Sequence, residues 1–225
     1  MCSIKDSVKQ AGSSQPSSNV ECGAKCSCVD CTNFIHDKLG QNGVEGNKNY
    51  LTHPTFDSGP TIGVGCDLGT GITKDELKSI PSISKETLDK LSEAIGLRGK
   101  EAADFCKEHK GETFPTEDID KISRWRLKKT IDDTRKQFNA AGGDFDNLSC
   151  EQQAVLVSVG HQHGGLKPNW DFTKHAASGD WQGACDDLVS WTGKKLGHEN
   201  RRDIEASWLE DAGVANRDWT KAVCD

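Results

Sequence analysis

The sequence predicts a mainly helical α+β fold, in which a small β-hairpin lobe and a helical lobe are joined by one long helix. In the segment Thr61–Gly65, β-branched residues alternate with glycine, a pattern typical of a short strand that lies close to another backbone. From Thr73 onward, apolar residues recur at helical spacing along almost the whole chain. The helical pattern over Thr116–Ala141 is long enough to connect two lobes, and Gly142 ends it.

The elements are expected in a simple order along the chain. A first helix is predicted over residues 30–39, where apolar residues recur at helical spacing and Gly40 acts as the stop. This helix would deliver Glu45 to a cleft, and a strand-and-turn lobe would follow over residues 50–71. Further helices are expected at residues 84–95, 101–109, 116–141, 148–159, 169–178, 181–191 and 200–212.

Length and composition indicate one large domain with a short N-terminal appendage. Of the 225 residues, 34% are hydrophobic and 28% are charged, which is polar for a globular protein but, with six tryptophans, does not indicate disorder. Residues 1–32 are predicted to form a flexible, cysteine-rich extension, and residues 33–225 the folded catalytic domain. No apolar run approaches the roughly 18 residues of a membrane span, so no membrane span is expected.

The ten cysteines are spread along the whole chain, and their even number predicts a disulfide framework formed in an oxidising compartment. We therefore expect a secreted protein in its mature form, without its leader. The connectivity cannot be deduced from the sequence. The group from Cys22 to Cys31 has a second interpretation as a thiolate zinc site, although its spacings do not form two Cys-x-x-Cys pairs. Cys66 is expected to be half of a disulfide rather than a catalytic nucleophile.

The stretch from Glu45 to Asp67 contains the residues that could carry chemistry. Three acids, Glu45, Asp57 and Asp67, lie around Thr61, and such a set suits glycoside hydrolysis, in which one carboxylic acid protonates the leaving oxygen and a second group handles the attacking water. Apolar neighbours of Glu45 are expected to raise its pKa by desolvation. The alternative is that these acids are solvated turn carboxylates, since acidic residues are common in loops.

The order Glu-Gly, then a Tyr-containing loop, then Thr-Ile-Gly-Val-Gly resembles the active-site hairpin of the phage-type lysozymes, the family of the T-even phage enzymes and the pesticin-like toxins. The resemblance continues over residues 148–156, which are similar to a helix of the form Leu-Ser-x-x-Gln-x-x-Ala-Leu. In all, it covers roughly residues 34 to 212. The next two family helices are matched by Trp181, Ala184, Leu188, Asn200, Arg201, Arg202, Glu205 and Leu209.

This resemblance implies a two-lobed lysozyme-like fold and a muramidase that cleaves the β-1,4 bond between N-acetylmuramic acid and N-acetylglucosamine with inversion. It implies that Glu45 is the general acid and that Thr61 helps to hold the water. The aspartate is open between Asp57, which precedes the threonine as in the phage enzymes, and Asp67, which follows it by six positions as in pesticin-like members. The spacing favours Asp67. Inversion predicts carboxyl groups about 6.5 to 9.5 Å apart, whereas about 5 to 5.5 Å would indicate retention.

Four residues are candidates for substrate binding. The resemblance implies that Arg201 pairs with the catalytic glutamate and that Gln162 lines the cleft; the alternatives are a surface arginine with a weak ion pair and a helix-end amide. Tyr50 lies in the Tyr-containing loop, and Trp191 is the tryptophan most suited to face the cleft and stack on sugar.

No cofactor and no metal are expected. His161 and His163 could suggest a metal site, but residues two positions apart on a helix point in different directions. The expected partner is bacterial peptidoglycan, bound by a monomer. Two other functions remain open: a catalytically inactive wall-binding protein on the same fold, and a chitinase-like hydrolase of N-acetylglucosamine polymers.

The net charge of −7 argues against nucleic acid and is unusual for a protein that acts on anionic walls. It predicts either a locally basic rim around the cleft or a preference for less anionic walls. The candidates for such a rim are Arg124, Arg126, Lys128 and Lys129.

Overall fold

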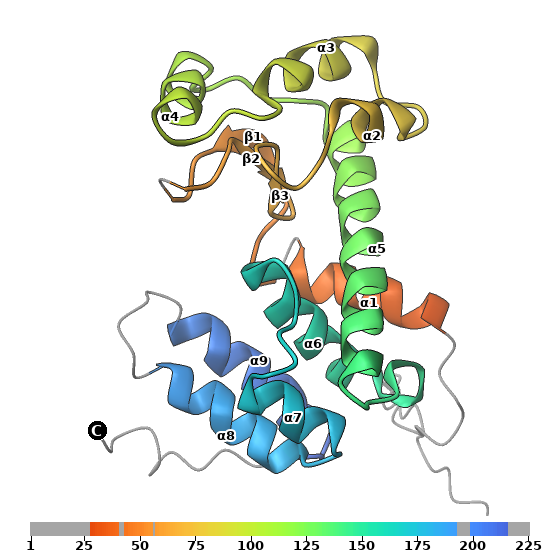
Figure 1. Ribbon diagram of the computed structural model, residues 1–225. Helices are drawn as coiled ribbons and strands as arrows, with labels where there is room; N and C mark the ends of the chain where they lie inside the picture. The colour runs from red at the N-terminus through yellow and green to blue at the C-terminus, as the bar shows by residue number, and fades with distance from the viewer. Residues whose placement is uncertain (1–27, 41–42, 56, 193–198, 216–225) are drawn as a thin grey trace, which may run out of the picture.

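The computed structural model describes residues 28–40, 43–55, 57–192 and 199–215, and it has two lobes that share one long helix (Figure 1). The small lobe holds a three-stranded sheet with β1 (Lys48–Thr52), β2 (Thr61–Gly63) and β3 (Cys66–Asp67), followed by α2 (Lys74–Ser79), α3 (Lys85–Ala94) and α4 (Gly99–Glu108). The large lobe holds α1 (Cys28–Leu39), the short 3₁₀ helix η1 (Phe145–Asn147), α6 (Cys150–His163), α7 (Asp171–Ala177), α8 (Trp181–Thr192) and α9 (Glu199–Asp211). Helix α5 (Thr116–Ala140) runs from one lobe to the other, which confirms the predicted mainly helical α+β fold.

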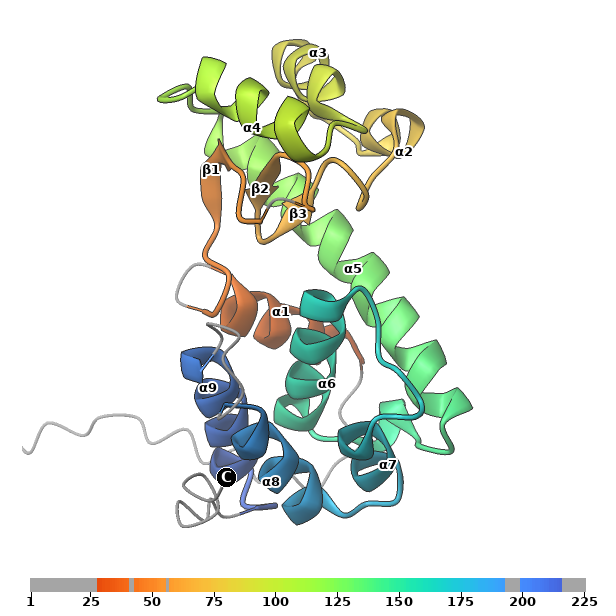
Figure 2. The same cartoon turned by 60° about the vertical axis from the view of Figure 1, so that its left-hand side comes forward.

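The sheet lies above α1 and the end of α6, with α5 along one side (Figure 2). Its strands are antiparallel in the order β1-β2-β3, and Thr61 is paired with Asp67. The chain reverses at Val64 and Gly65, so the strand predicted over residues 61–65 ends at Gly63, and its last two residues form the turn of a hairpin. Gly63 and Gly65 both have positive φ values, of 61° and 65°, which glycine adopts without strain.

Gly63 lies where β2 packs against α5, and a side chain would not fit there. A β-carbon at this position would lie 2.3 Å from the hydroxyl oxygen of Ser123 on α5. The Ser123 hydroxyl in turn accepts a hydrogen bond from the Val64 N–H (3.1 Å) and donates one to Asn47 Oδ1 (3.1 Å). The absence of a side chain at Gly63 therefore lets the hairpin dock directly on the long helix.

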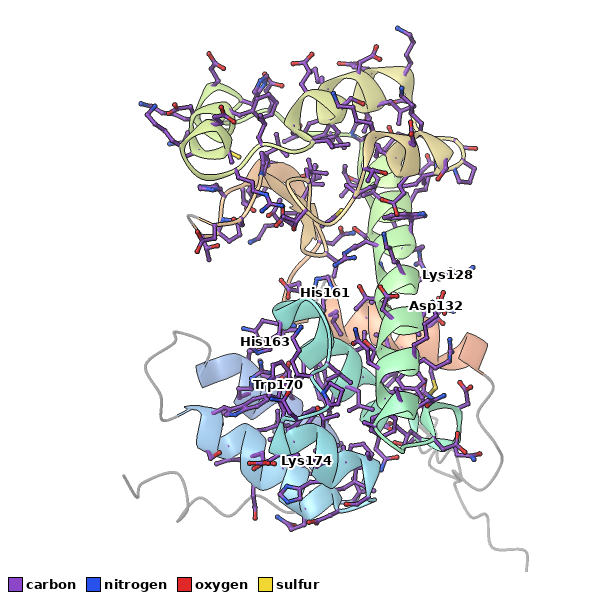
Figure 3. All side chains as sticks on the ribbon, viewed as in Figure 1. Lys128, Asp132, His161, His163, Trp170 and Lys174 are labelled. Atoms are coloured by element: carbon purple, nitrogen blue, oxygen red, sulfur yellow. A yellow bond between two sulfur atoms is a disulfide. The ribbon has the colours of Figure 1, made fainter. Side chains whose placement is uncertain are left out.

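Helix α5 belongs to both hydrophobic cores. Its N-terminal half contributes Ile119 and Ile122 to the small-lobe core, and its C-terminal half contributes Leu127, Ile131 and Phe138 to the large-lobe core. The polar side chains of Lys128 and Asp132 lie on the face turned away from α6 (Figure 3). The helix thus forms part of the core of each lobe and does not merely connect them.

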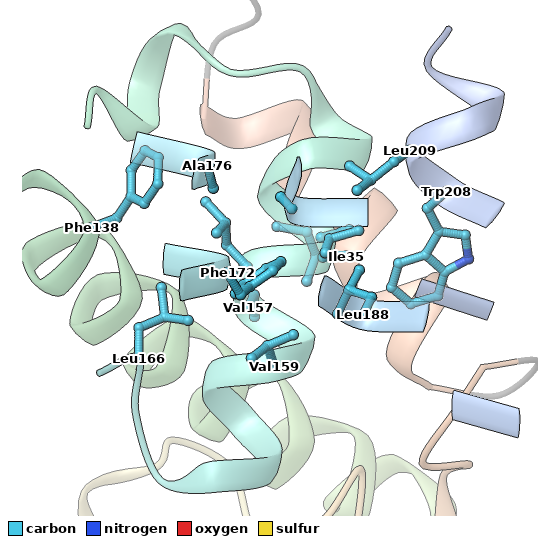
Figure 4. Packing of buried hydrophobic residues seen from close by; sticks show 14 of the residues in the cluster. Ile35, Phe138, Val157, Val159, Leu166, Phe172, Ala176, Leu188, Trp208 and Leu209 are labelled. Atoms are coloured by element: carbon cyan, nitrogen blue, oxygen red, sulfur yellow. The ribbon is translucent and has the colours of Figure 1, made fainter. Parts of the chain in front are cut away.

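The large-lobe core surrounds α6, whose residues 152–160 are all buried. Ile35, Phe172, Leu188 and Trp208 close around the helix from α1, α7, α8 and α9 (Figure 4). This packing accounts for the nearly continuous apolar run in α6, because the helix has no face turned to water. The helix begins with a capping box at Ser149 and ends at Gly164, which adopts the left-handed conformation.

One disulfide joins α1 to the start of α6, between Cys31 and Cys150, which are 119 positions apart. Cys31 is therefore not part of a zinc site with Cys22, Cys26 and Cys28. It is also fully buried in the large-lobe core, in a helix that begins at Cys28. Helix α1 therefore begins five residues before the domain boundary predicted at residue 33. Residues 1–27 of the flexible extension predicted over residues 1–32 lie outside the described residues.

The expectation that Cys66 forms a disulfide is wrong. Cys66 is a free thiol on β3, buried in the small-lobe core, and Cys106 is another free thiol among the described residues. Burial raises the pKa of Cys66 to about 12, so the sulfur stays protonated at neutral pH and is unsuited to nucleophilic chemistry.

Within the described part of the chain, no helix combines the length and apolar character that crossing a membrane requires.

Candidate active site

A cleft of about 710 Å³ lies between the two lobes and brings together most of the predicted site residues. Glu45, Gln162 and Arg201 line it from the large-lobe side. Thr61 and Asp67 line it from the hairpin. The two groups are therefore contributed by opposite walls of one hollow.

Glu45 is held in the cleft by the loop that follows α1. The N–H of Glu45 donates to the Leu39 carbonyl (3.0 Å) and the N–H of Val44 to the Lys38 carbonyl (3.3 Å), so the loop folds back onto the helix end. The Glu45 carboxylate is ion-paired with the Arg201 guanidinium. Burial is the largest single influence and raises its pKa, but the charge of Arg201, the nearby His161 and the hydrogen bond from Arg201 together outweigh it, and the net pKa lies below the ordinary value. The expectation that Glu45 has a raised pKa is thus wrong for the free protein.

A buried network fixes Arg201 opposite Glu45. The Arg201 Nε donates to Glu205 Oε1 (3.0 Å), and its Nη2 donates to the Ser158 carbonyl (2.9 Å) and the Ser158 hydroxyl (2.9 Å). Glu205, which is fully buried, also accepts from Arg202, and Arg202 donates to Gln162 Oε1. Arg201 is thus a strongly held partner of Glu45, not a surface arginine.

His161 is the site residue that sequence reasoning missed. Its side chain is only 4% exposed, and its Nε2 lies 4.0 Å from Glu45 Oε1 while its Nδ1 lies 3.5 Å from the Thr130 hydroxyl. Burial, together with Arg126 and Arg201, lowers its pKa to about 4 against the opposing pull of Glu45, so the imidazole is neutral at neutral pH. The only signal in the sequence was its place at the end of a buried helix, beside Gln162.

Gly65 lies where the hairpin packs against the side chains of His161 and Glu45. A β-carbon at position 65 would lie 2.5 Å from His161 Nε2 and 3.2 Å from Glu45 Oε2. Together with its φ of 65°, this leaves room for glycine alone.

Asp67 is held by groups close to it in the chain. Its Oδ1 accepts hydrogen bonds from the N–H groups of Gly59 (3.0 Å) and Gly69 (2.7 Å), and its Oδ2 accepts one from the Thr70 hydroxyl (2.9 Å). Thr61 is the cross-strand neighbour of Asp67, so the two side chains project from the same face of the hairpin. The Thr61 hydroxyl donates to the Gly59 carbonyl (3.2 Å), which leaves its oxygen able to accept.

The family model for pesticin, described as the C-terminal part of a bacterial toxin homologue of phage lysozyme, matches residues 29–182, more than half of the chain. This chain belongs to the pesticin family. The match includes Glu45, Thr61, Asp67 and Gln162, whereas Arg201 lies C-terminal to it. A search of curated protein sequences finds no match. Membership supports a glycosidase-type hydrolase of the lysozyme kind, with peptidoglycan as its class of substrate.

Three predicted site residues of this pesticin-family domain do not line the cleft. Asp57 is exposed in the turn before β2, and Tyr50 is 45% exposed on β1. Trp191 packs edge-on against His163 and Trp170, with ring centroids 6.1 and 5.6 Å away, in an aromatic cluster of the large lobe. Of the two aspartates, Asp67 is the one that reaches the cleft.

Of the four residues predicted to form a basic rim, only Arg126 lines the cleft. Arg124 and Lys129 are ion-paired with carboxylates of the small lobe and of α5 itself. Lys128 is on the far side of α5 (Figure 3). The residues that the structure describes contain no group of three or more His, Cys, Asp or Glu side chains suited to a metal ion.

Proposed function

We propose that this pesticin-family domain is a muramidase that cleaves the β-1,4 bond between N-acetylmuramic acid and N-acetylglucosamine in bacterial peptidoglycan, with inversion. The observation that carries the proposal is the cleft itself, which is lined by Glu45 on the large-lobe wall and by the Thr61–Asp67 pair on the hairpin wall. An inverting glycosidase needs two such groups on either side of the scissile bond.

In this mechanism Glu45 protonates the glycosidic oxygen, and a water held by Asp67 and Thr61 attacks the anomeric carbon from the opposite face. Asp67 Oδ1 already accepts two backbone hydrogen bonds, while Oδ2 accepts only one, from Thr70. Oδ2 is therefore the oxygen with capacity to take the proton of the water. The Thr61 hydroxyl accepts a hydrogen bond from the same water and orients it.

Glu45 acts as an acid only when it carries a proton. In the free protein, the ion pair with Arg201 keeps the pKa of Glu45 below its ordinary value, and the carboxyl group is ionised at neutral pH. A saccharide that fills the cleft excludes water and increases the burial contribution, which raises the pKa of Glu45. We infer that Glu45 takes up its proton as substrate binds and that activity declines as the pH rises.

The domain is proposed to act outside the cell as a monomer and without a cofactor. The disulfide between Cys31 and Cys150 supports folding in an oxidising compartment, because such bonds rarely persist in a reducing one.

The test is the clearing of purified bacterial cell walls, followed by analysis of the sugar at each new reducing end. We expect clearing by the wild type with muramic acid at the new ends, and a loss of at least about a hundredfold for Glu45→Gln, since a general acid contributes that much or more. Asp67→Asn should lose activity comparably. Asp57→Asn is the matched control and should stay active.

Intact binding to walls without any clearing by the wild type would contradict the proposal and indicate a wall-binding protein on a lysozyme fold. Equal losses for the two aspartate variants, with both still folded by circular dichroism, would contradict the role given to Asp67.

A further inference from the structure

Arg126 is a charged side chain in the cleft that has no hydrogen-bond or ion-pair partner among the residues that the structure describes. It lies on α5 and lines both the cleft and a smaller adjoining cavity of about 120 Å³, between α5 and the turn that follows α6. Its Nε is buried and makes no hydrogen bond, and within the described ranges no carboxylate oxygen lies within 4.0 Å of its guanidinium. Because Arg126 lines the cleft and its guanidinium has no carboxylate partner there, its positive charge is open to an anionic ligand.

The other charges of the cleft already have partners. The charged residues that line it are Glu45, Asp67, Arg126 and Arg201. Glu45 and Arg201 are paired with each other, and the Asp67 oxygens accept three hydrogen bonds from their own loop. Among the described residues that line the cleft, Arg126 is thus the cation without a partner, in a chain whose net charge is −7.

The backbone around Arg126 sets how a ligand can approach. A β-carbon at Gly71 would lie 3.6 Å from Arg126 Nε, so the small-lobe backbone packs against that side of the guanidinium. On the other side, the small cavity is lined by polar residues of α5, including Thr130 and Asp133. Asp133 lies about 10 Å farther along the helix by its rise per residue and would repel an anion from the far end of the cavity. An anion is therefore best placed at the mouth, next to Arg126.

A guanidinium binds a carboxylate through two parallel hydrogen bonds, a geometry that neutral sugar hydroxyls do not offer. Polymers of N-acetylglucosamine carry no carboxylate. Muramic acid carries one on its lactyl group, which is either free or linked to a peptide stem that has carboxylates of its own. We propose that Arg126 binds a carboxylate of the muramyl substituent and thereby selects peptidoglycan over chitin. This inference rests on the proposed function and assigns its specificity.

The test measures binding of uncleaved ligands by calorimetry in the Glu45→Gln protein, with and without Arg126→Gln. The ligands share one glycan backbone: muramyl oligosaccharide with its peptide stem, the same oligosaccharide with a free lactyl carboxylate, its lactyl amide, and a chitin oligomer. Arg124→Gln, on the same helix but outside the cleft, is the matched control.

We expect Arg126→Gln to weaken binding of a carboxylate ligand by about tenfold to a hundredfold, as for other charge-assisted pairs, and to leave the amide and the chitin oligomer unchanged. Arg126→Lys should recover part of the loss, because it restores the charge but not the two-pronged contact. A loss on the free-lactyl ligand alone identifies the lactyl carboxylate, a loss on the stem-bearing ligand alone identifies a stem carboxylate, and a loss on both shows that Arg126 accepts either one.

Equal weakening of all four ligands, or of none, would overturn the proposal. The result does not depend on turnover, so it is separate from a failure of the proposed function: a wild-type protein that clears no walls could still show carboxylate binding that depends on Arg126.

Discussion

The two walls of the cleft hold their carboxylates in different ways. On the large-lobe wall, Glu45 is positioned by a side chain 156 residues away, Arg201, which is itself fixed by Ser158 and Glu205. On the hairpin wall, Asp67 is positioned by donors that lie two, three and eight residues from it. The first carboxylate is therefore tuned by long-range charge, and the second is held by local hydrogen bonds.

This difference suits the two proposed tasks. An acid must gain and lose a proton, and its pKa responds to its surroundings, here burial, the charge of Arg201 and the nearby imidazole of His161. A residue that orients water must keep its position, and backbone N–H groups fix a carboxylate without introducing another charge. The large-lobe wall should therefore be much more sensitive to substitution than the hairpin wall.

The largest effect is expected from Arg201→Met, which removes the charge that holds the large-lobe wall together. Glu205, fully buried, would lose one of its two arginine partners, and breaking a buried pair costs about 3 to 5 kcal/mol of unfolding free energy. The pKa of Glu45 should rise at the same time. Urea unfolding and a pH titration of Glu45 by NMR check both effects.

Arg124→Met is the control for this experiment, because Arg124 forms an exposed ion pair with Asp120 on α5 and should cost at most about 0.5 kcal/mol. Equal effects of the two substitutions would contradict a special role for the network.

A smaller effect is expected from His161→Gln, and it should depend on pH. The folded-state pKa of His161 is lowered to about 4, whereas the unfolded value is near 6.5. Between these values the unfolded chain binds more protons, so stability falls as the pH is lowered, by roughly 2 to 3 kcal/mol from pH 7.5 to 4.5. Thermal unfolding over this range should show that decline in the wild type and a flatter profile in the variant.

His175 provides a control of opposite sign. Its hydrogen bond to Asp187 raises its pKa, so its contribution to stability is present at low pH and is lost as the pH rises through the folded-state pKa. The contribution is small because His175 is well exposed. A steeper acid decline in His161→Gln than in the wild type would show that the buried imidazole is not the destabilising group.

The smallest effect is expected on the hairpin wall. Thr70→Val removes one of the three hydrogen bonds to Asp67 and leaves both backbone donors in place. Loss of a single exposed hydrogen bond should cost about 1 kcal/mol and lower wall-clearing activity no more than about tenfold. A loss as large as that of Arg201→Met would mean that the hairpin wall is no more robust than the large-lobe wall.

The sequence was informative where structure is set locally. The helix predicted over residues 84–95 begins where Ser84 caps α3, whereas the helix predicted over residues 148–159 stops four residues before His163, the last residue of α6. The spacing of six between Thr61 and Asp67 corresponds to their pairing across one hairpin.

Residues that act over long distances were harder to predict. His161 faces Glu45 because α6 ends beneath the hairpin, and no local pattern carries that information. The lowered pKa of Glu45 depends on Arg201 being close in space, whereas its apolar neighbours in the chain predict only the burial contribution. Trp191 is a residue type that stacks on sugars, but it lies in the aromatic cluster with His163 and Trp170.

The different roles proposed for the two walls are tested most directly by the anomeric configuration of the first product. Proton NMR of a defined muramyl oligosaccharide, recorded in the first minutes of cleavage, reports the anomeric form at the new reducing end before it equilibrates. If Glu45 donates the proton and a water on Asp67 attacks from the opposite face, the product is the α-anomer. A β-anomer as the first product would show a retaining route and contradict the role given to the hairpin wall.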